Sequence, residues 1–107
     1  YDSAQLLNQI PEDTDIVITH GPIYGYGDMT ANTYQNVGCE DLYRRLKELK
    51  TPLHFTGHIH EGYGYNHTIW DGYSFNGCNC NLRYEALNLP ITFDYNLLMP
   101  LCYHLPN

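Results

Sequence analysis

The sequence predicts an α/β domain with a mixed sheet and flanking helices. A short β-branched run at residues 16–19 is followed by a long loop, an amphipathic helix at residues 39–50 and a second apolar run at residues 53–56. This strand–helix–strand order is typical of a parallel crossover unit. Beyond residue 64, short strand-like runs between turn signals predict an antiparallel flank to the sheet.

Length and charge restrict the class of protein. The 107 residues are enough for one small domain with a thin core. The net charge of −7 argues against a nucleic-acid-binding face and against an anionic membrane partner. No apolar run approaches the length of a membrane-spanning helix and no signal peptide is visible, so we predict a cytoplasmic protein. The chain begins at Tyr1 rather than Met, and we therefore expect a fragment.

The first third of the chain predicts a helix, a strand and a loop. Residues 2–10 form an apolar stripe that Asp2 or Ser3 caps and a proline ends. Residues 16–19 are apolar on both faces, which predicts a strand buried in the middle of a sheet. Residues 21–38 carry glycine, proline, asparagine and tyrosine without a clear period. Loops of this length are usually functional or mobile.

Residues 39–50 give the clearest helix. Leu42, Leu46 and Leu49 fall on one face, and a proline closes the segment. Acidic residues in the first turn and lysines in the last match the helix dipole. Residues 53–56 then predict the second strand of the crossover unit.

The second half of the chain predicts weaker elements. Residues 73–76 and 91–94 predict strands, residues 82–89 a weaker strand or an irregular stretch, and Asp71-Gly72 a turn. Residues 95–107 predict no clear element.

The cysteines give no clear metal-binding pattern. Cys78 and Cys80 are too close in sequence for the usual structural zinc spacing. For these two and for Cys39 and Cys102, we favour buried, reduced thiols over disulfides or a metal site.

Histidines follow both strands of the crossover unit. His20 comes after the first strand, and His58 and His60 after the second, each in a glycine-rich setting. Ligands of open α/β sheets bind beyond the carboxyl ends of strands, and residues i and i+2 of an extended segment point the same way. Neutral imidazole binds Zn, Mn, Fe, Ni and Cu. Each histidine alone is also explained as an ordinary loop residue, but together they predict part of a metal site.

These histidines lie in two recognisable strings. Thr19-His20-Gly21-Pro22 and Gly57-His58-Ile59-His60 resemble the last two motifs of the calcineurin-like metallophosphoesterases. Further matches at residues 25–28, 37–39, 61–64 and 75–76 make the chain similar to the metallophosphoesterase-domain-containing branch, a set of small phosphodiesterases. The resemblance implies a four-layer α/β/β/α sandwich, of which residues 1–107 would be the C-terminal portion, with the N-terminal half absent.

The resemblance also implies a chemistry. Two divalent ions, commonly Mn, Fe or Zn, would polarise the phosphoryl group of a small phosphodiester or nucleotide substrate and activate the attacking water. By motif matching, His20 and His58 would bind the second ion and His60 the first. The first half of such a site, which supplies Asp-x-His, Gly-Asp and Gly-Asn-His motifs, is not matched by this chain. We therefore assign no catalytic residue and expect little turnover from this chain alone.

Further site residues are less specific. Asp28 and Glu61 could orient a histidine or the substrate, although a turn or cap role in their loops explains each of them as well. Four tyrosines could stack on a nucleoside base or simply pack the loop: Tyr24, Tyr26, Tyr63 and Tyr65. His54 lies within a strand, which predicts packing, and Asn76 matches a family position with a structural role.

A second function class remains open. The chain could be a non-catalytic metal-binding or interaction module, a degenerate copy that pairs with a partner chain. The absent first half would leave a sheet edge and an apolar face uncovered, so a dimer through the uncovered sheet is also expected.

Overall fold

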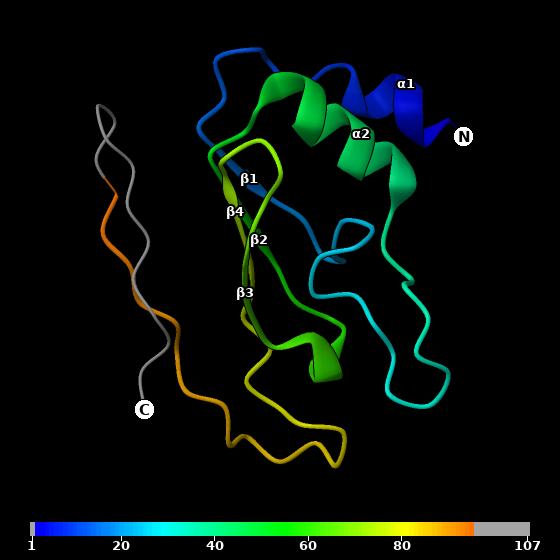
Figure 1. Ribbon diagram of the computed structural model, residues 1–107, viewed down its shortest axis with the longest axis vertical. Coiled ribbons are helices and arrows are strands. Elements are labelled where there is room, and N and C mark those ends of the chain that lie inside the picture. Colours follow the sequence, from blue (N-terminus) through cyan, green and yellow to red (C-terminus); the bar gives the residue numbers. More distant parts are fainter. Residues whose placement is uncertain (1, 96–107) are drawn as a thin grey trace.

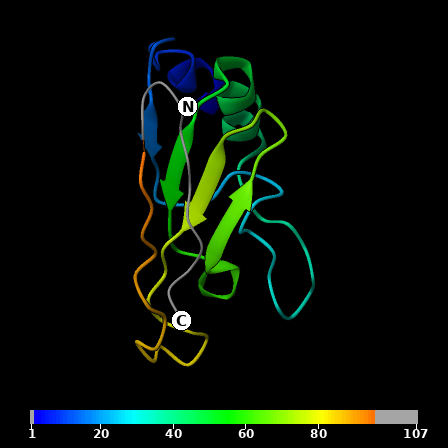
Figure 2. The ribbon, with the colours of Figure 1, turned by 60° about the vertical axis from the view of Figure 1, so that its left-hand side comes forward.

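A computed structural model describes residues 2–95, with two helices on one side of a small sheet (Figure 1). The segment after β4 returns along the other side of the sheet (Figure 2). In chain order the elements are α1 (Ser3–Leu7), β1 (Ile16–Ile18), α2 (Glu40–Leu49), β2 (Leu53–Thr56), the 3-10 turn η1 (His60–Gly62), β3 (Gly64–His67) and β4 (Tyr73–Asn76). None of the described helices is long and apolar enough to cross a membrane.

The sheet is mixed, and its strands lie in the order β1-β2-β4-β3. β1 pairs with β2, and β2 with β4, in parallel, whereas β3 pairs with β4 antiparallel. The parallel crossover and the antiparallel flank that the sequence predicts are therefore both confirmed. Three parallel strands end at the same edge of the sheet, and this edge positions the site described below.

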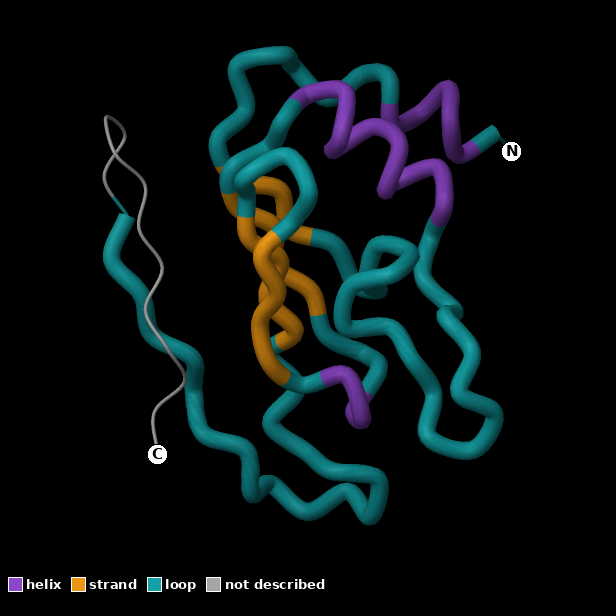
Figure 3. Tube along the Cα trace, in the orientation of Figure 1, coloured by secondary structure: helices purple, strands orange, loops and turns teal. Residues whose placement is uncertain are grey.

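Two predicted features of the second half differ from the structure. Residues 91–94 form no strand, because their backbone joins no ladder. Their apolar pattern reflects side-chain packing instead, since Phe93 packs its ring on Phe55 and Phe75, with centroid distances of 5.4 and 4.9 Å. Most of the segment after β4 is loop (Figure 3). Conversely, β3 was not predicted, because Gly64–His67 is polar and glycine-containing and becomes a strand through its pairing with β4. Beyond Tyr95, the predicted tail lies outside the described residues.

The prediction of a buried central strand at residues 16–19 is also wrong. In the described part of the chain, β1 lies at the edge of the sheet. Ile16 and Ile18 are 47% and 77% exposed, so one apolar face of β1 has no cover from residues 2–95. Because residues 16–19 are apolar on both faces, we predicted that other elements would cover both faces of this strand. Residues 2–95 leave the face with Ile16 and Ile18 uncovered.

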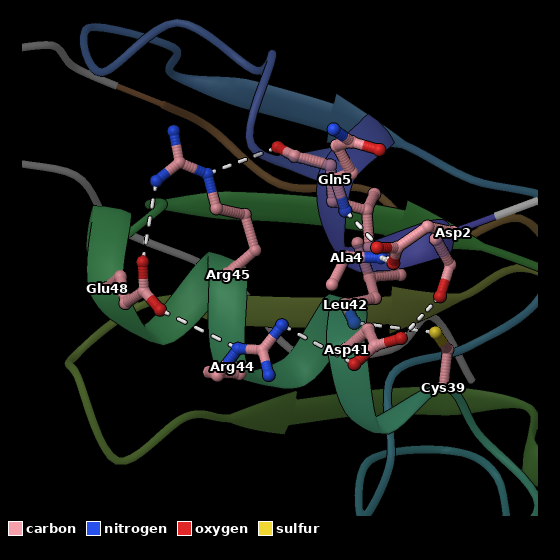
Figure 4. Close-up of polar contacts among 11 residues, drawn as sticks. Asp2, Ala4, Gln5, Cys39, Asp41, Leu42, Arg44, Arg45 and Glu48 are labelled. Atoms are coloured by element: carbon pink, nitrogen blue, oxygen red, sulfur yellow. Dashed lines mark hydrogen bonds and ion pairs between the residues drawn. The ribbon is translucent and has the colours of Figure 1, made fainter.

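The two helices are capped by their own side chains and joined by Arg45 (Figure 4). The Asp2 carboxylate accepts the first free N–H groups of α1, and the Cys39 sulfur accepts one from α2. α1 ends at Leu7 rather than at the predicted residue 10. The Arg45 guanidinium donates to the carbonyls of Leu7 and Ile10 at 3.1 and 2.7 Å and so joins this segment to α2. α2 ends at Leu49, and its C-cap Lys50 adopts the left-handed conformation. The apolar face of α2 packs into the core, which comprises Ile23, Leu42, Leu46, Leu53 and Phe75.

The cysteines are less buried than predicted. Cys39 is exposed, because it caps α2 at the surface, and Cys78 and Cys80 are half-buried. All three are free thiols in the structure. Cys102 lies outside the described residues.

Candidate metal centre

His20 and His58 come together at the carboxyl edge of the sheet. His20 follows β1 and His58 follows β2, and their ring centroids lie 4.6 Å apart. The His20 carbonyl accepts hydrogen bonds from the Gly57 N–H and the Thr56 hydroxyl, both at 3.1 Å, and these two bonds hold the strand ends together. Both imidazoles are exposed and can reach one shared ligand.

His58 has an unusual backbone conformation. Its φ is +68°, in the left-handed region that only a few per cent of non-glycine residues adopt, with asparagine, aspartate and histidine there more often than the rest. Holding histidine there costs of order 1 kcal/mol, and such strain concentrates at functional sites. The conformation turns the chain between the end of β2 and η1, and His58 and His60 border different recesses.

His60 begins η1 and is oriented by a backbone carbonyl. Its Nδ1 lies 3.0 Å from the Asn81 carbonyl oxygen. Because a carbonyl only accepts, Nδ1 carries the proton and Nε2 keeps its lone pair. A carbonyl partner on the other ring nitrogen is usual for metal-binding histidines, since it fixes the ring and its tautomer. The edge of the ring also meets Tyr84, at a centroid distance of 5.3 Å.

The three histidines do not form one metal-binding group. Among residues 2–95, no three His, Cys, Asp or Glu side chains come close enough together to hold an ion. His58 borders a recess of about 440 Å³, and His60 borders a different recess of about 550 Å³. The donors present therefore fit part of a metal centre, a pair of imidazoles and a separate third, and they lack the carboxylate oxygens that would complete it.

Asp28 is buried within the loop that follows His20. The side chain is 2% exposed, and its Oδ2 accepts the N–H groups of Gly25 and Gly38 at 3.0 and 2.8 Å. These bonds tie the two ends of the glycine-rich loop together. They place the carboxylate in loop structure, and its predicted contact with a ligand or a histidine stays a prediction.

Glu61 lies on the surface beside His60. Its Oε2 accepts the Ala31 N–H at 2.9 Å, and this hydrogen bond lowers the pKa of the carboxyl. The bond links η1 to the tip of the long loop. The role predicted for Glu61 in orienting a ligand stays a prediction as well.

Three of the four predicted tyrosines are engaged in packing or hydrogen bonds. Tyr26 packs against Tyr43 and Trp70, Tyr65 packs against Phe75, and the Tyr63 hydroxyl donates to the Leu89 carbonyl. Tyr24 is exposed. The packing alternative is therefore confirmed for Tyr26, whereas Tyr65 packs on the sheet rather than on the loop.

Asn76, the last residue of β4, joins three segments around the site. Its Nδ2 donates to the Gly27 and Ile59 carbonyls at 3.0 and 2.8 Å, and its Oδ1 accepts the Cys78 N–H. Gly62 must be glycine here, because a Cβ would lie 2.0 Å from the Gly27 carbonyl oxygen. The structural role predicted for Asn76 is confirmed.

Sequence reasoning missed two groups of residues around the site. Asn81, which orients His60, lies in an irregular segment without any periodic signal. Thr19 and Ser74 hydrogen-bond to the two ring nitrogens of His54, a link that becomes visible only once the sheet register is known.

Comparisons with known proteins agree with the resemblance. No family model matches the chain. Over 90 residues, which are 81% of this chain, it is 42% identical to the human "Metallophosphoesterase domain-containing protein 1" and 41% identical to a UPF0046 protein of Caenorhabditis elegans. Over 81 residues it is 37% identical to the "Probable rhamnogalacturonate lyase C" of Emericella nidulans, a match that covers 7% of that protein.

The matched segment is only part of each relative. It spans 27% of the human protein and 22% of the Caenorhabditis elegans protein. The chain thus spans about a quarter of the length of these relatives. It belongs to the metallophosphoesterase-domain-containing branch of proteins.

Proposed function

We propose that this chain is the histidine-bearing part of a metal-dependent phosphoesterase that hydrolyses a small phosphodiester or nucleotide at a two-metal site. The observation that carries the proposal is the His20–His58 ring pair at the shared carboxyl edge of β1 and β2. The left-handed backbone of His58 and the unprotonated Nε2 of His60 support it. Carboxylate ligands from outside residues 2–95 would complete the centre.

The residues divide the work in this proposal. His20 and His58 would share one ion, and His60, which faces a different recess, would bind the other. Bound divalent ions, of which Mn, Fe and Zn all suit imidazole, polarise a phosphoryl oxygen and activate water for attack. The neutral imidazoles supply lone pairs, and the backbone bonds between the strand ends keep His20 and His58 together.

The recess beside His58 would accept the organic group of the substrate. Pro22, Val37, Leu42 and Ile59 give it an apolar lining. An ester with an aromatic or aliphatic alcohol would place that group there and its phosphoryl group near His20 and His58. The net charge of −7 does not favour a nucleic-acid polymer or an anionic membrane as partner, and we propose a cytoplasmic location.

Metal titration of the chain tests the ligand assignment. We expect Zn²⁺ or Mn²⁺ to bind, and His20→Ala or His58→Ala to weaken binding at least about tenfold, since each removes one of two paired donors. His67→Ala is the matched control, because His67 is exposed and pairs with Asp71 away from the site. Isothermal titration calorimetry measures the affinities. Unchanged affinity in both alanine variants would refute the assignment.

Turnover tests the reaction. With an aryl phosphodiester and Mn²⁺, we expect hydrolysis by the whole protein and its loss in His58→Ala. The chain alone should show little or none, and a kcat of about 1 s⁻¹ or more from it would contradict the incomplete site. A whole protein that is inactive with every divalent metal would refute the phosphoesterase proposal.

The second candidate is a non-catalytic metal-binding or interaction module. It is favoured by the absence of a complete ligand group within residues 2–95 and by the exposed isoleucines of β1. In this proposal the histidines are a residual site and the apolar face pairs with another chain. A whole protein that binds metal and turns over substrate would exclude it.

A further inference from the structure

We propose that His54 is a positioning residue that, through Thr19 and Ser74, holds the turn bearing His20 against the end of β2. His54 lies in the middle of β2 and is 1% exposed. Within residues 2–95, its side chain makes no hydrogen bond to His20 or His58. The inference rests on the proposed function only for the metal-binding role of His20, because the positioning itself is a property of the fold.

The three side chains form a continuous chain of hydrogen bonds across the sheet. Ser74 Oγ lies 2.8 Å from His54 Nδ1, and His54 Nε2 lies 2.8 Å from Thr19 Oγ1. Thr19 Oγ1 in turn donates to the Gly21 carbonyl at 2.6 Å. This series of hydrogen bonds thus begins in β4, crosses β2 and ends in the turn after β1 that contains His20.

The direction of each hydrogen bond follows from its neighbours. The Gly21 carbonyl only accepts, so the single hydroxyl hydrogen of Thr19 points to it. Thr19 Oγ1 must then accept from His54, which places the proton on Nε2. Nδ1 is left with its lone pair and accepts from the Ser74 hydroxyl. One arrangement of protons therefore satisfies the hydroxyls of Thr19 and Ser74 and both ring nitrogens of His54, and it fixes the His54 ring and the Thr19 rotamer together.

Burial keeps His54 in the state that this arrangement needs. It lowers the pKa of His54 to about 4, so the ring is neutral at physiological pH. In the neutral ring, one nitrogen donates and the other accepts, as the chain requires.

Other bonds from β2 hold the same turn. The Thr19 N–H donates to the Phe55 carbonyl at 3.0 Å, and the Gly57 N–H donates to the His20 carbonyl at 3.1 Å. These backbone bonds fix the path of the chain on either side of His20. The Thr19 side chain adds the bond to Gly21 that closes the turn, and His54 determines which way that side chain points.

Four variants test this role. Thr19→Val removes the hydroxyl while keeping the shape, Thr19→Ser keeps the hydroxyl, and Ser74→Ala removes the donor to His54. Thr68→Val is the matched control, because Thr68 is a buried threonine whose hydroxyl accepts the Gly72 N–H in the turn at the other end of the sheet. For each variant, urea unfolding gives the stability, metal-free NMR gives the nuclear Overhauser contact between the His20 and His58 rings, and calorimetry gives the Ni²⁺ affinity.

We expect the ring contact to disappear or weaken in Thr19→Val and Ser74→Ala and to persist in Thr19→Ser and Thr68→Val. Ni²⁺ affinity should fall about fivefold in the first two variants, the factor to which one hydrogen bond corresponds. If both variants lose stability as Thr68→Val does but keep the ring contact, His54 is merely structural and the proposal is overturned. Should Thr19→Val fail to fold, the milder Ser74→Ala decides. A wild-type chain that binds no Ni²⁺ counts against the proposed function, while the ring contact still decides this inference.

Discussion

At the scale of the residue, the histidines in and beyond the strands have opposite environments. His54 is buried within the sheet, whereas His20 and His58 are exposed at its edge. The sequence predicted both environments, because a histidine inside a strand packs and a histidine after a strand faces the ligand edge. It did not predict Thr19 and Ser74 as the partners of His54, because these lie 35 and 20 residues away and meet it only through the strand register. Nor did it predict Asn81 as the partner of His60.

The buried His54 should make the stability of the fold depend on pH. Its pKa of about 4 in the folded state lies below the value of 6.5 expected for the unfolded chain, so the unfolded state binds the proton first. The resulting stability is complete above pH 6.5 and is lost as the pH falls toward 4. Two and a half pKa units correspond to about 3 kcal/mol. We expect the free energy of unfolding to fall by that order between pH 7 and pH 4, as measured by urea denaturation.

His54→Gln provides the control for this prediction. Glutamine can donate and accept hydrogen bonds but does not titrate, and the carboxylates contribute equally to both proteins. The variant should therefore lose less stability than the wild type over the same pH range. Parallel stability curves for the two proteins would contradict a neutral buried His54.

At the scale of the element, periodic segments were predictable and paired segments were not. α2 carries its own signal in leucine spacing and β2 in a short apolar run, and both were confirmed within one residue. β3 has no such signal and depends on β4 for its hydrogen bonds. Residues 91–94 alternate apolar and polar side chains as a strand does, but here the apolar Phe93 packs on Phe75 of the sheet without any strand pairing. A pattern of burial thus indicates which side chains pack, and it does not indicate whether the backbone pairs.

The loop between His20 and α2 depends on Asp28 for its order. Asp28→Ala would leave the N–H groups of Gly25 and Gly38 without their acceptor, and each buried donor left unpaired costs about 1–3 kcal/mol. We expect a loss of about 2–4 kcal/mol in the free energy of unfolding, measured by urea denaturation. Asp13→Ala, at an exposed aspartate, should change it by less than about 0.5 kcal/mol.

A second variant, Asp28→Asn, distinguishes the two roles that the sequence left open for Asp28. If Asp28 only orders the loop, Asp28→Asn, which keeps one oxygen, should recover most of the stability, and the metal affinity of the folded protein should match that of the wild type. A large loss of affinity in a stable Asp28→Asn variant would instead support a contact with a ligand or a histidine.

At the scale of the whole molecule, the strand–helix–strand order predicted the sheet and the edge at which the histidines meet. The position of β1 was not predicted, because strand composition indicates which faces are apolar and does not indicate what covers them. Within residues 2–95 the outer face of β1 carries Ile16 and Ile18 without cover. An uncovered apolar edge strand is a surface on which another chain or another segment pairs.

The uncovered face of β1 leads to a prediction of self-association. We expect this chain to dimerise at micromolar concentrations, and Ile18→Lys to shift it to monomer, because a charged side chain on an edge strand opposes pairing. Ile69→Lys is the matched control, since Ile69 is 66% exposed in the turn between β3 and β4, whereas Ile18 is 77% exposed on β1. Light scattering coupled to size exclusion, over a range of concentrations, measures the mass. A wild-type chain that stays monomeric throughout, or an Ile69→Lys variant that dissociates as Ile18→Lys does, would show that the β1 face is not the dimer interface.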